Sequence, residues 1–218
     1  MPRQKESHNL YPPLTVANVH LEKSFSVKYL GVYIDCHLTW HDHIDFICGK
    51  ISKNINIMVK LKHYLSKATL ISVYYSLIYP YLTYACTLWG NNYNAPLSQI
   101  VKLQNKAVRV INDVSLMASI TPHYTSLGLL KFPDIVELNT CISAFLRLFP
   151  LVSELYNYST RSASFNQVAI PSFRTNLRRF CPSIIGSFFW NDIPKFIRDK
   201  PMRKMFWKAL LRWCLAQY

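Results

Sequence analysis

The alternation of apolar and polar positions near the start of the chain predicts a short strand or hairpin. Residues 27–35 are rich in β-forming side chains, and Gly31 among them marks a bend or a close approach of the backbone. Residues 1–26 are polar and contain prolines before they gain apolar residues, so we expect a loose lead-in with one edge strand. The sequence thus predicts a small β element ahead of the first helix.

A helical repeat of apolar residues starts directly after this element. Thr39 can cap a helix that begins at Trp40. Its apolar positions recur at three- and four-residue steps and fall on one face of a helical wheel: Ile44, Ile47, Ile51, Ile55, Met58, Leu61 and Leu65. Lys53 and Lys60 fall nearly opposite, and Lys50 lies at the flank. We expect one face to enter a core and the other to contact water or phosphate.

Residues 68–101 contain no charged side chain, and they raise the question of a membrane span. Ser66 can cap a helix here, and residues 70–89 would be ~30 Å long as one helix, which is enough to cross a bilayer. The same stretch contains Pro80 together with serine, threonine and tyrosine, and it lacks continuous aliphatic content. We therefore predict a buried, proline-kinked helix and regard membrane association as unlikely.

The next helix carries polar residues that become relevant to binding. Asn94 or Pro96 opens it, and its apolar stripe leaves Gln104, Lys106 and Arg109 elsewhere on its surface. The two basic residues of this set are therefore candidates for contact with an anionic partner.

Two more helices are predicted from their boundary residues. Thr121 and Pro122 are the N-cap and first-position signals of a short helix that Gly128 ends. A longer apolar repeat starts at Phe132 and stops at Pro150, which cannot continue a helix.

The C-terminal region differs in composition from the rest. Residues 157–173 are rich in Ser, Thr and Asn and are the best candidate for a linker, with a short strand expected at residues 165–170. Residues 174–218 are basic and aromatic. The last predicted helix, from Pro201, places basic residues on one arc (Lys204, Lys208 and Arg212) and apolar residues on the other (Met202, Phe206, Leu210 and Trp213).

The charge balance points to a polyanionic partner. Lys and Arg number 25 against 11 Asp and Glu, so the formal net charge is +14. Such a surplus repels itself unless a polyanion offsets it, and nucleic acid or an anionic membrane is the expected partner. A merely basic protein remains an alternative. Half of the residues are hydrophobic, which argues against disorder.

The cysteines and the N-terminal residues predict an intracellular location in the nucleus, the cytoplasm or both, and not secretion. The six cysteines form no C-x-x-C pair, and the opening residues have no apolar signal region. A reducing compartment with free thiols follows.

Two groups of residues could suggest metal chemistry, but neither has the required pattern. One is a set of thiols and imidazoles: Cys36, His37, His41, His43 and Cys48. It contains no C-x2–4-C pair, and His41 and His43 point to different sides of a helix. Asp42 and Asp45 fit the ordinary preference for acids in a first helical turn. We predict no catalytic residue and no metal site in this chain.

Several stretches resemble the reverse transcriptases of non-LTR (LINE-type, jockey-like) retrotransposons. The first is Tyr29-Leu30-Gly31-Val32-Tyr33-Ile34-Asp35, followed by Leu38-Thr39-Trp40 and the basic amphipathic helix. The others keep the family's order: Leu77-Ile78-Tyr79-Pro80-Tyr81-Leu82-x-Tyr84 with Trp89-Gly90; Leu103-Gln104-Asn105-Lys106-Ala107-Val108-Arg109; Thr160-Arg161; Pro171-x-x-Arg174; and Gly186 with Trp190-Asn191-Asp192-Ile193-Pro194. Each stretch is modest alone, but the ordered set is specific.

The resemblance implies a division of the chain into four segments. Residues 1–39 would be the trailing edge of the palm subdomain, and residues 40–112 the helical thumb that holds template and growing strand. Residues 113–156 would be further helices packed on the thumb, and residues 157–218 a basic C-terminal region. The expected fold is therefore mainly α, with a short N-terminal strand or hairpin, a thumb-like helical bundle and a small basic α/β C-terminal region.

The resemblance also implies what this sequence does not carry. In that family an aromatic-x-Asp-Asp hairpin precedes the first matching stretch, and the palm holds Mg²⁺ for the polymerase; neither the hairpin nor a cofactor site is expected in these residues. We therefore expect a non-catalytic C-terminal fragment of an RNA-directed DNA polymerase. Its expected partners are template RNA, cDNA or their hybrid, and the upstream polymerase segment.

Basic residues on the predicted exposed faces are the candidate nucleic-acid contacts: Lys50, Lys53, Lys60, Lys106, Arg109, Arg174, Arg178, Arg179, Arg203, Lys204 and Lys208. Two alternatives compete with this hypothesis. One is a basic helical protein associated with a membrane through residues 70–89 and its C-terminal helix. The other is an inactive remnant that makes only protein–protein contacts.

Overall fold

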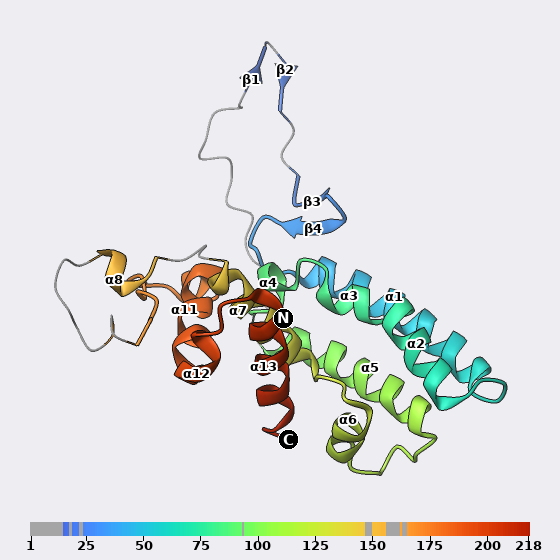
Figure 1. Ribbon diagram of the computed structural model, residues 1–218. Coiled ribbons are helices and arrows are strands. Elements are labelled where there is room, and N and C mark those ends of the chain that lie inside the picture. Colours follow the sequence, from blue (N-terminus) through green and yellow to red (C-terminus); the bar gives the residue numbers. More distant parts are fainter. Residues whose placement is uncertain are drawn as a thin grey trace.

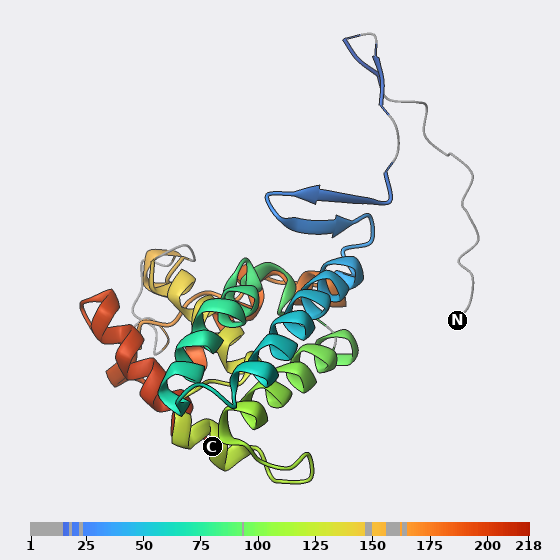
Figure 2. The same ribbon diagram turned by 90° about the vertical axis from the view of Figure 1, so that its right-hand side faces the viewer.

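The computed structural model describes residues 15–17, 19–21, 24–92, 94–146, 150–155, 162 and 165–218. These residues confirm the mainly α-helical prediction, and two small antiparallel ribbons precede the helices (Figure 1). The ribbons project from one end of the helical body, which Figure 2 shows from the side.

The N-terminal β structure consists of two separate hairpins. Strand β1 (Thr15–Val16) pairs with β2 (Val19–His20), and β3 (Ser26–Tyr29) pairs with β4 (Val32–Asp35). Leu30 and Gly31 form the turn of the second hairpin, and both have positive φ, 46° and 84°. A two-residue turn of this kind matches the twist of paired strands and favours glycine. The prediction of a strand or hairpin is thus confirmed as a hairpin.

Helix α1 (His41–Leu61) starts where the sequence predicted, but not with the predicted cap. No side-chain hydrogen bond from Thr39 caps it, and Trp40 at the N-cap position has a left-handed backbone. The carboxylate of Asp35 instead accepts the backbone N–H groups of Thr39 (3.0 Å) and Trp40 (2.7 Å). The last residue of the hairpin therefore fixes the entry into α1.

Residues 70–89, which were expected to form one kinked helix, lie in three helices. Ser66 caps α2 (Lys67–Leu77) as predicted, because its hydroxyl accepts the Thr69 N–H at 3.2 Å. Pro80 lies in the first turn of α3 (Tyr79–Thr83), and Ala85 with φ 51° separates it from α4 (Cys86–Trp89). Among the described residues, no helix combines the length and the apolar character needed to cross a bilayer.

The remaining helices include the four that the sequence predicted and others that it did not. They are α5 (Asn94–Asn112), α6 (Thr121–Leu127), α7 (Phe132–Phe145), α8 (Val152–Leu155), α10 (Asn176–Arg179), α11 (Pro182–Asp192), α12 (Lys195–Arg198) and α13 (Arg203–Leu215). Gly128 ends α6 with φ 63°, as expected, whereas α7 ends before Pro150.

The C-terminal region shows less β structure than expected. Instead of a strand at residues 165–170, the described residues contain one isolated antiparallel bridge between Leu151 and Val168. The proposed linker at residues 157–173 lies partly outside the described residues.

A continuous core joins the helices, and α7 lies at its centre. Helix α7 packs against α3, α4, α5, α11 and α13. The buried Trp89 ring stacks on Phe132 with centroids 5.4 Å apart, and its Nε1 donates to the Tyr84 carbonyl at 3.0 Å. At Gly90 a Cβ atom would lie 2.6 Å from Val136 Cγ2, so only glycine lets the end of α4 approach α7 this closely. Buried side chains from α1 to α13 belong to this core. The division of the chain into four segments remains a prediction.

A buried amide links three helices inside this core. Gln104 on α5 is fully buried, which corrects the expectation that it lies on the surface. Its Nε2 donates to the Tyr74 hydroxyl on α2 (3.0 Å) and to the Leu130 carbonyl (2.9 Å), and its Oε1 accepts the Phe132 N–H (2.8 Å). Phe132 is the first residue of α7 and Leu130 lies two residues before it, at a helix end where backbone N–H groups lack helical partners. Gln104 supplies those partners.

We expect Gln104→Leu to destabilise the protein by about 3–5 kcal/mol, because it leaves backbone groups of Leu130 and Phe132 buried without partners. Tyr74→Phe removes only one of the hydrogen bonds and should cost about 1 kcal/mol. Urea unfolding of both variants tests this order. Equal losses for the two variants would contradict the central role of the amide.

A half-buried carboxyl group on α7 links stability to pH. Burial raises the pKa of Glu137 from 4.5 to about 7, and Asp134 and Asp192 act in the same direction. The folded state therefore holds a proton that the unfolded chain releases near pH 4.5. The stabilisation from this proton is present at low pH and is lost as the pH rises through about 7.

We expect Glu137→Gln to be more stable than the parent at pH 8 by about 1–3 kcal/mol, and to match it more closely near pH 4.5. Thermal or urea unfolding between pH 4.5 and 8 measures the difference. Asp45→Asn, at an exposed site on α1, is the control for loss of one negative charge. A constant difference across this pH range would refute the linkage.

Candidate nucleic-acid interface

After Asp42 and Asp45 in the first turns of α1, no further acidic residue occurs up to the end of α5. Between Asp45 and Asp113 the sequence contains eight basic residues: Lys50, Lys53, Lys60, Lys62, Lys67, Lys102, Lys106 and Arg109. Uncompensated positive charge of this kind attracts polyanions, so the position of these side chains on the fold decides whether they can act together.

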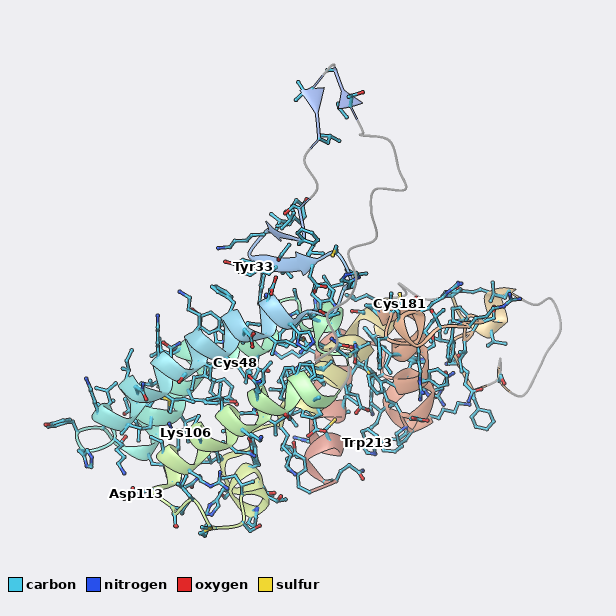
Figure 3. The ribbon with its side chains drawn as sticks, turned by 180° about the vertical axis from the view of Figure 1, so that it is seen from behind. Tyr33, Cys48, Lys106, Asp113, Cys181 and Trp213 are labelled. Atoms are coloured by element: carbon cyan, nitrogen blue, oxygen red, sulfur yellow. The ribbon has the colours of Figure 1, made fainter. Side chains whose placement is uncertain are left out.

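Helices α1 and α5 lie side by side and run in the same direction. At their N-terminal ends, Asn92 Nδ2 donates to the Thr39 carbonyl at 2.8 Å. At their C-terminal ends, Lys62 Nζ lies 2.6 Å from Asp113 Oδ1. Figure 3 shows the two helices next to each other, with Lys106 on α5 and Asp113 beyond its end. The pair is thus tied at both ends.

The lysines predicted on α1 occupy its solvent side. Lys50, Lys53 and Lys60 are exposed, while the apolar repeat from Ile44 to Met58 is buried. Lys50 Nζ lies 5.5 Å from the centroid of the Phe46 ring, a cation–π contact that holds the ammonium group near the helix. The predicted amphipathic character of this helix is therefore confirmed.

The two basic residues predicted on α5 differ in their exposure to solvent. Lys106 is exposed, whereas Arg109 is half-buried and its Nη2 donates to the Ala118 carbonyl at 3.5 Å. Arg109 Nε is buried without a hydrogen-bond partner. Lys102, one turn before Lys106, is also exposed. The sequence analysis missed Lys102, although its four-residue spacing from Lys106 was a usable signal.

The exposed lysines of α1 and α5 lie on two neighbouring helices. Each helix buries its apolar side in the shared core and leaves its lysines exposed. With a rise of ~1.5 Å per residue, Lys53 and Lys60 are ~10 Å apart along α1, and Lys102 and Lys106 are ~6 Å apart along α5. We call Lys50, Lys53, Lys60, Lys102 and Lys106 the α1–α5 basic surface.

The predicted C-terminal cations lie on or next to α10 and α13. Arg174, Arg178, Arg179, Arg203, Lys204 and Lys208 are all exposed. On α13, Phe206 and Leu210 are buried as expected, whereas Met202 is exposed. Figures 1 and 2 show α13 on a different side of the helical body from α1, so the predicted residues do not form one continuous site.

The histidines and cysteines near the start of α1 do not converge. His43 is buried and lies edge-on to Trp89, with ring centroids 5.4 Å apart, and its Nδ1 accepts the Tyr33 N–H at 3.4 Å. Burial lowers its pKa below the usual value. In the part of the chain that the structure describes, no group of three or more His, Cys, Asp or Glu side chains could hold a metal ion.

Comparison with known proteins gives a partial match. The chain is 28% identical over 108 residues to the probable RNA-directed DNA polymerase from transposon X-element of Drosophila melanogaster. It is 26% identical over 104 residues to the probable RNA-directed DNA polymerase from transposon BS of the same organism. Each match covers 46% of this chain, but only 11% and 12% of the relatives. These similarities support a relation to retrotransposon reverse transcriptases.

The match thus spans about a tenth of the length of these relatives. No family model matches the chain, and no solved structure is significantly similar to it.

Proposed function

We propose that this chain is a nucleic-acid-binding, non-catalytic part of a non-LTR, jockey-like retrotransposon reverse transcriptase. In this proposal, α1 to α5 act as the thumb that holds template RNA and cDNA. The polymerase names of the two Drosophila relatives support the general relation. The observation that carries the binding function is the α1–α5 basic surface, with five exposed lysines on two parallel helices.

The proposed binding mode is electrostatic. Each lysine that approaches a phosphate releases condensed counterions from the nucleic acid, and this release supplies affinity without reading sequence. The stretch between Asp45 and Asp113 has no carboxylate to repel phosphates. In this proposal the contacts at both ends of α1 and α5 hold the two lysine-bearing helices side by side before the strand binds. Such preorganisation lowers the entropic cost of binding.

The proposal assigns the chemistry to a segment outside this chain. Mg²⁺ and the catalytic aspartates would belong to a palm subdomain, and the β3–β4 hairpin would adjoin it. Three apolar residues of that hairpin are strongly exposed: Val27 (52%), Tyr29 (63%) and Leu30 (73%). An exposed apolar patch fits a protein contact, and the upstream polymerase segment is the proposed partner. The proposed location is the nucleus, the cytoplasm or both.

We expect the triple variant Lys50→Ala, Lys53→Ala, Lys60→Ala to bind nucleic acid with a log–log salt dependence flatter by about 3 units, because about three phosphate contacts are lost. Fluorescence anisotropy with an RNA–DNA hybrid between 50 and 200 mM salt, a range of about fourfold, measures the slope.

The triple Lys→Arg variant at the same positions is the matched control and should keep the parental slope, since it keeps the charge. Circular dichroism establishes that both variants are folded. An unchanged slope in the Ala variant would rule out phosphate contact by these three lysines.

A further inference from the structure

A groove lies between α12 and α13, away from the α1–α5 basic surface. Its volume is about 510 Å³, within the range of small-ligand sites. It is lined by five apolar and three basic residues: Phe196, Ile197, Met205, Ala209 and Trp213, with Lys200, Lys208 and Arg212. Neither Lys200 nor Arg212 was among the candidate contacts from the sequence.

The apolar side chains of the groove remain open to solvent. Phe196 is 67% exposed and Met205 is 46% exposed, while Trp213 is half-buried at the edge of the core. Exposing aromatic rings to water is unfavourable unless a ligand covers them. The aromatic rings of Phe196 and Trp213, one from each helix, offer surfaces on which a flat ligand can stack.

The charges of the groove select an anionic ligand. Lys208 and Arg212 are one helical turn apart on α13 and therefore lie on the same side of it. None of the described residues that line the groove is acidic. Asp199, the only acidic residue of 193–218, lines the neighbouring cavity and accepts a hydrogen bond from Asn166 Nδ2 at 2.9 Å.

We propose that this groove binds unpaired bases of a single nucleic-acid strand, with Phe196 and Trp213 stacking on the bases and Lys200, Lys208 and Arg212 contacting the adjoining phosphates. Stacking is available to every base because each has a π-face, whereas bases within a duplex are already stacked. The groove thus adds a single-strand contact to the proposed function, on which it rests. An acidic peptide would use the same cations but has no need of base stacking.

The test compares two oligonucleotides that differ only in their bases. One is an eight-residue thymidine oligonucleotide, and the other is an abasic strand with the same number of phosphates. We expect Phe196→Ala to weaken binding of the thymidine oligonucleotide by about tenfold, because one stacking contact is lost. Binding of the abasic strand should not change. Phe196→Tyr keeps the ring and should bind both strands as the parent does.

Phe25→Ala is the matched control, because Phe25 is 70% exposed and lies next to the β3–β4 hairpin. It should leave both affinities unchanged. The proposal is overturned if Phe196→Ala leaves thymidine binding unchanged or weakens both strands equally. It is also overturned if poly-glutamate binds with the same dependence on Phe196, since that result identifies an acidic peptide site.

A second readout separates this proposal from the proposed function. Stacking of a base on Trp213 should quench tryptophan fluorescence, and Trp213→Phe should lose most of that quenching while it keeps binding. The triple alanine variant on α1 should keep the Phe196 effect on thymidine binding. If the Phe196 effect is present but that variant has an unchanged salt slope, the α1–α5 assignment fails and the groove stands. If the triple variant has a flatter salt slope but Phe196→Ala has no effect, only the groove proposal fails.

Discussion

The buried amide of Gln104 is the interaction on which the arrangement of the helices depends. It bonds to α2 through Tyr74 and to the start of α7 through Leu130 and Phe132, while its own helix, α5, lies against α1. An amide in a dry core is favourable only when its polar groups are paired, so the geometry of these hydrogen bonds restricts how the helices can approach. The position of α5 beside α1 is thereby fixed from the core side.

This arrangement places the lysine-bearing helices α1 and α5 next to each other. Lysines on α1 and α5 would be separate stripes if the helices packed elsewhere, but the ties from Asn92 to Thr39 and from Lys62 to Asp113 align the two helices in parallel. The exposed ion pair adds little stability by itself. Its importance is geometric, because it marks the level at which both helices end. The lysines of both helices are exposed, and residues 46–112 contain no carboxylate.

Local signals predicted the helices well where one residue controls a boundary. Ser66 and Gly128 act as the sequence indicated, because a hydroxyl acceptor and a left-handed glycine serve only the adjacent turn. The predictions failed where a residue outside the expected signal determines the boundary of a helix. Asp35 replaces Thr39 at the entry to α1, and Ala85 breaks the uncharged stretch so that Trp89 reaches Phe132. No periodicity could show these contacts.

The sequence by itself determined the composition of the surfaces: a positive charge of +14, a lysine-bearing face on α1 and a basic, aromatic C-terminal region. Helical periodicity is a local property, so it predicts the buried and exposed faces of a helix but not which other helices pack against it. Only the tertiary structure decided which exposed residues meet. It placed Lys102 with the α1 lysines, turned Arg109 toward Ala118, and brought Phe196 and Trp213 to one groove. These placements depend on how the helices and the segments between them pack, which the sequence pattern of a single helix does not specify.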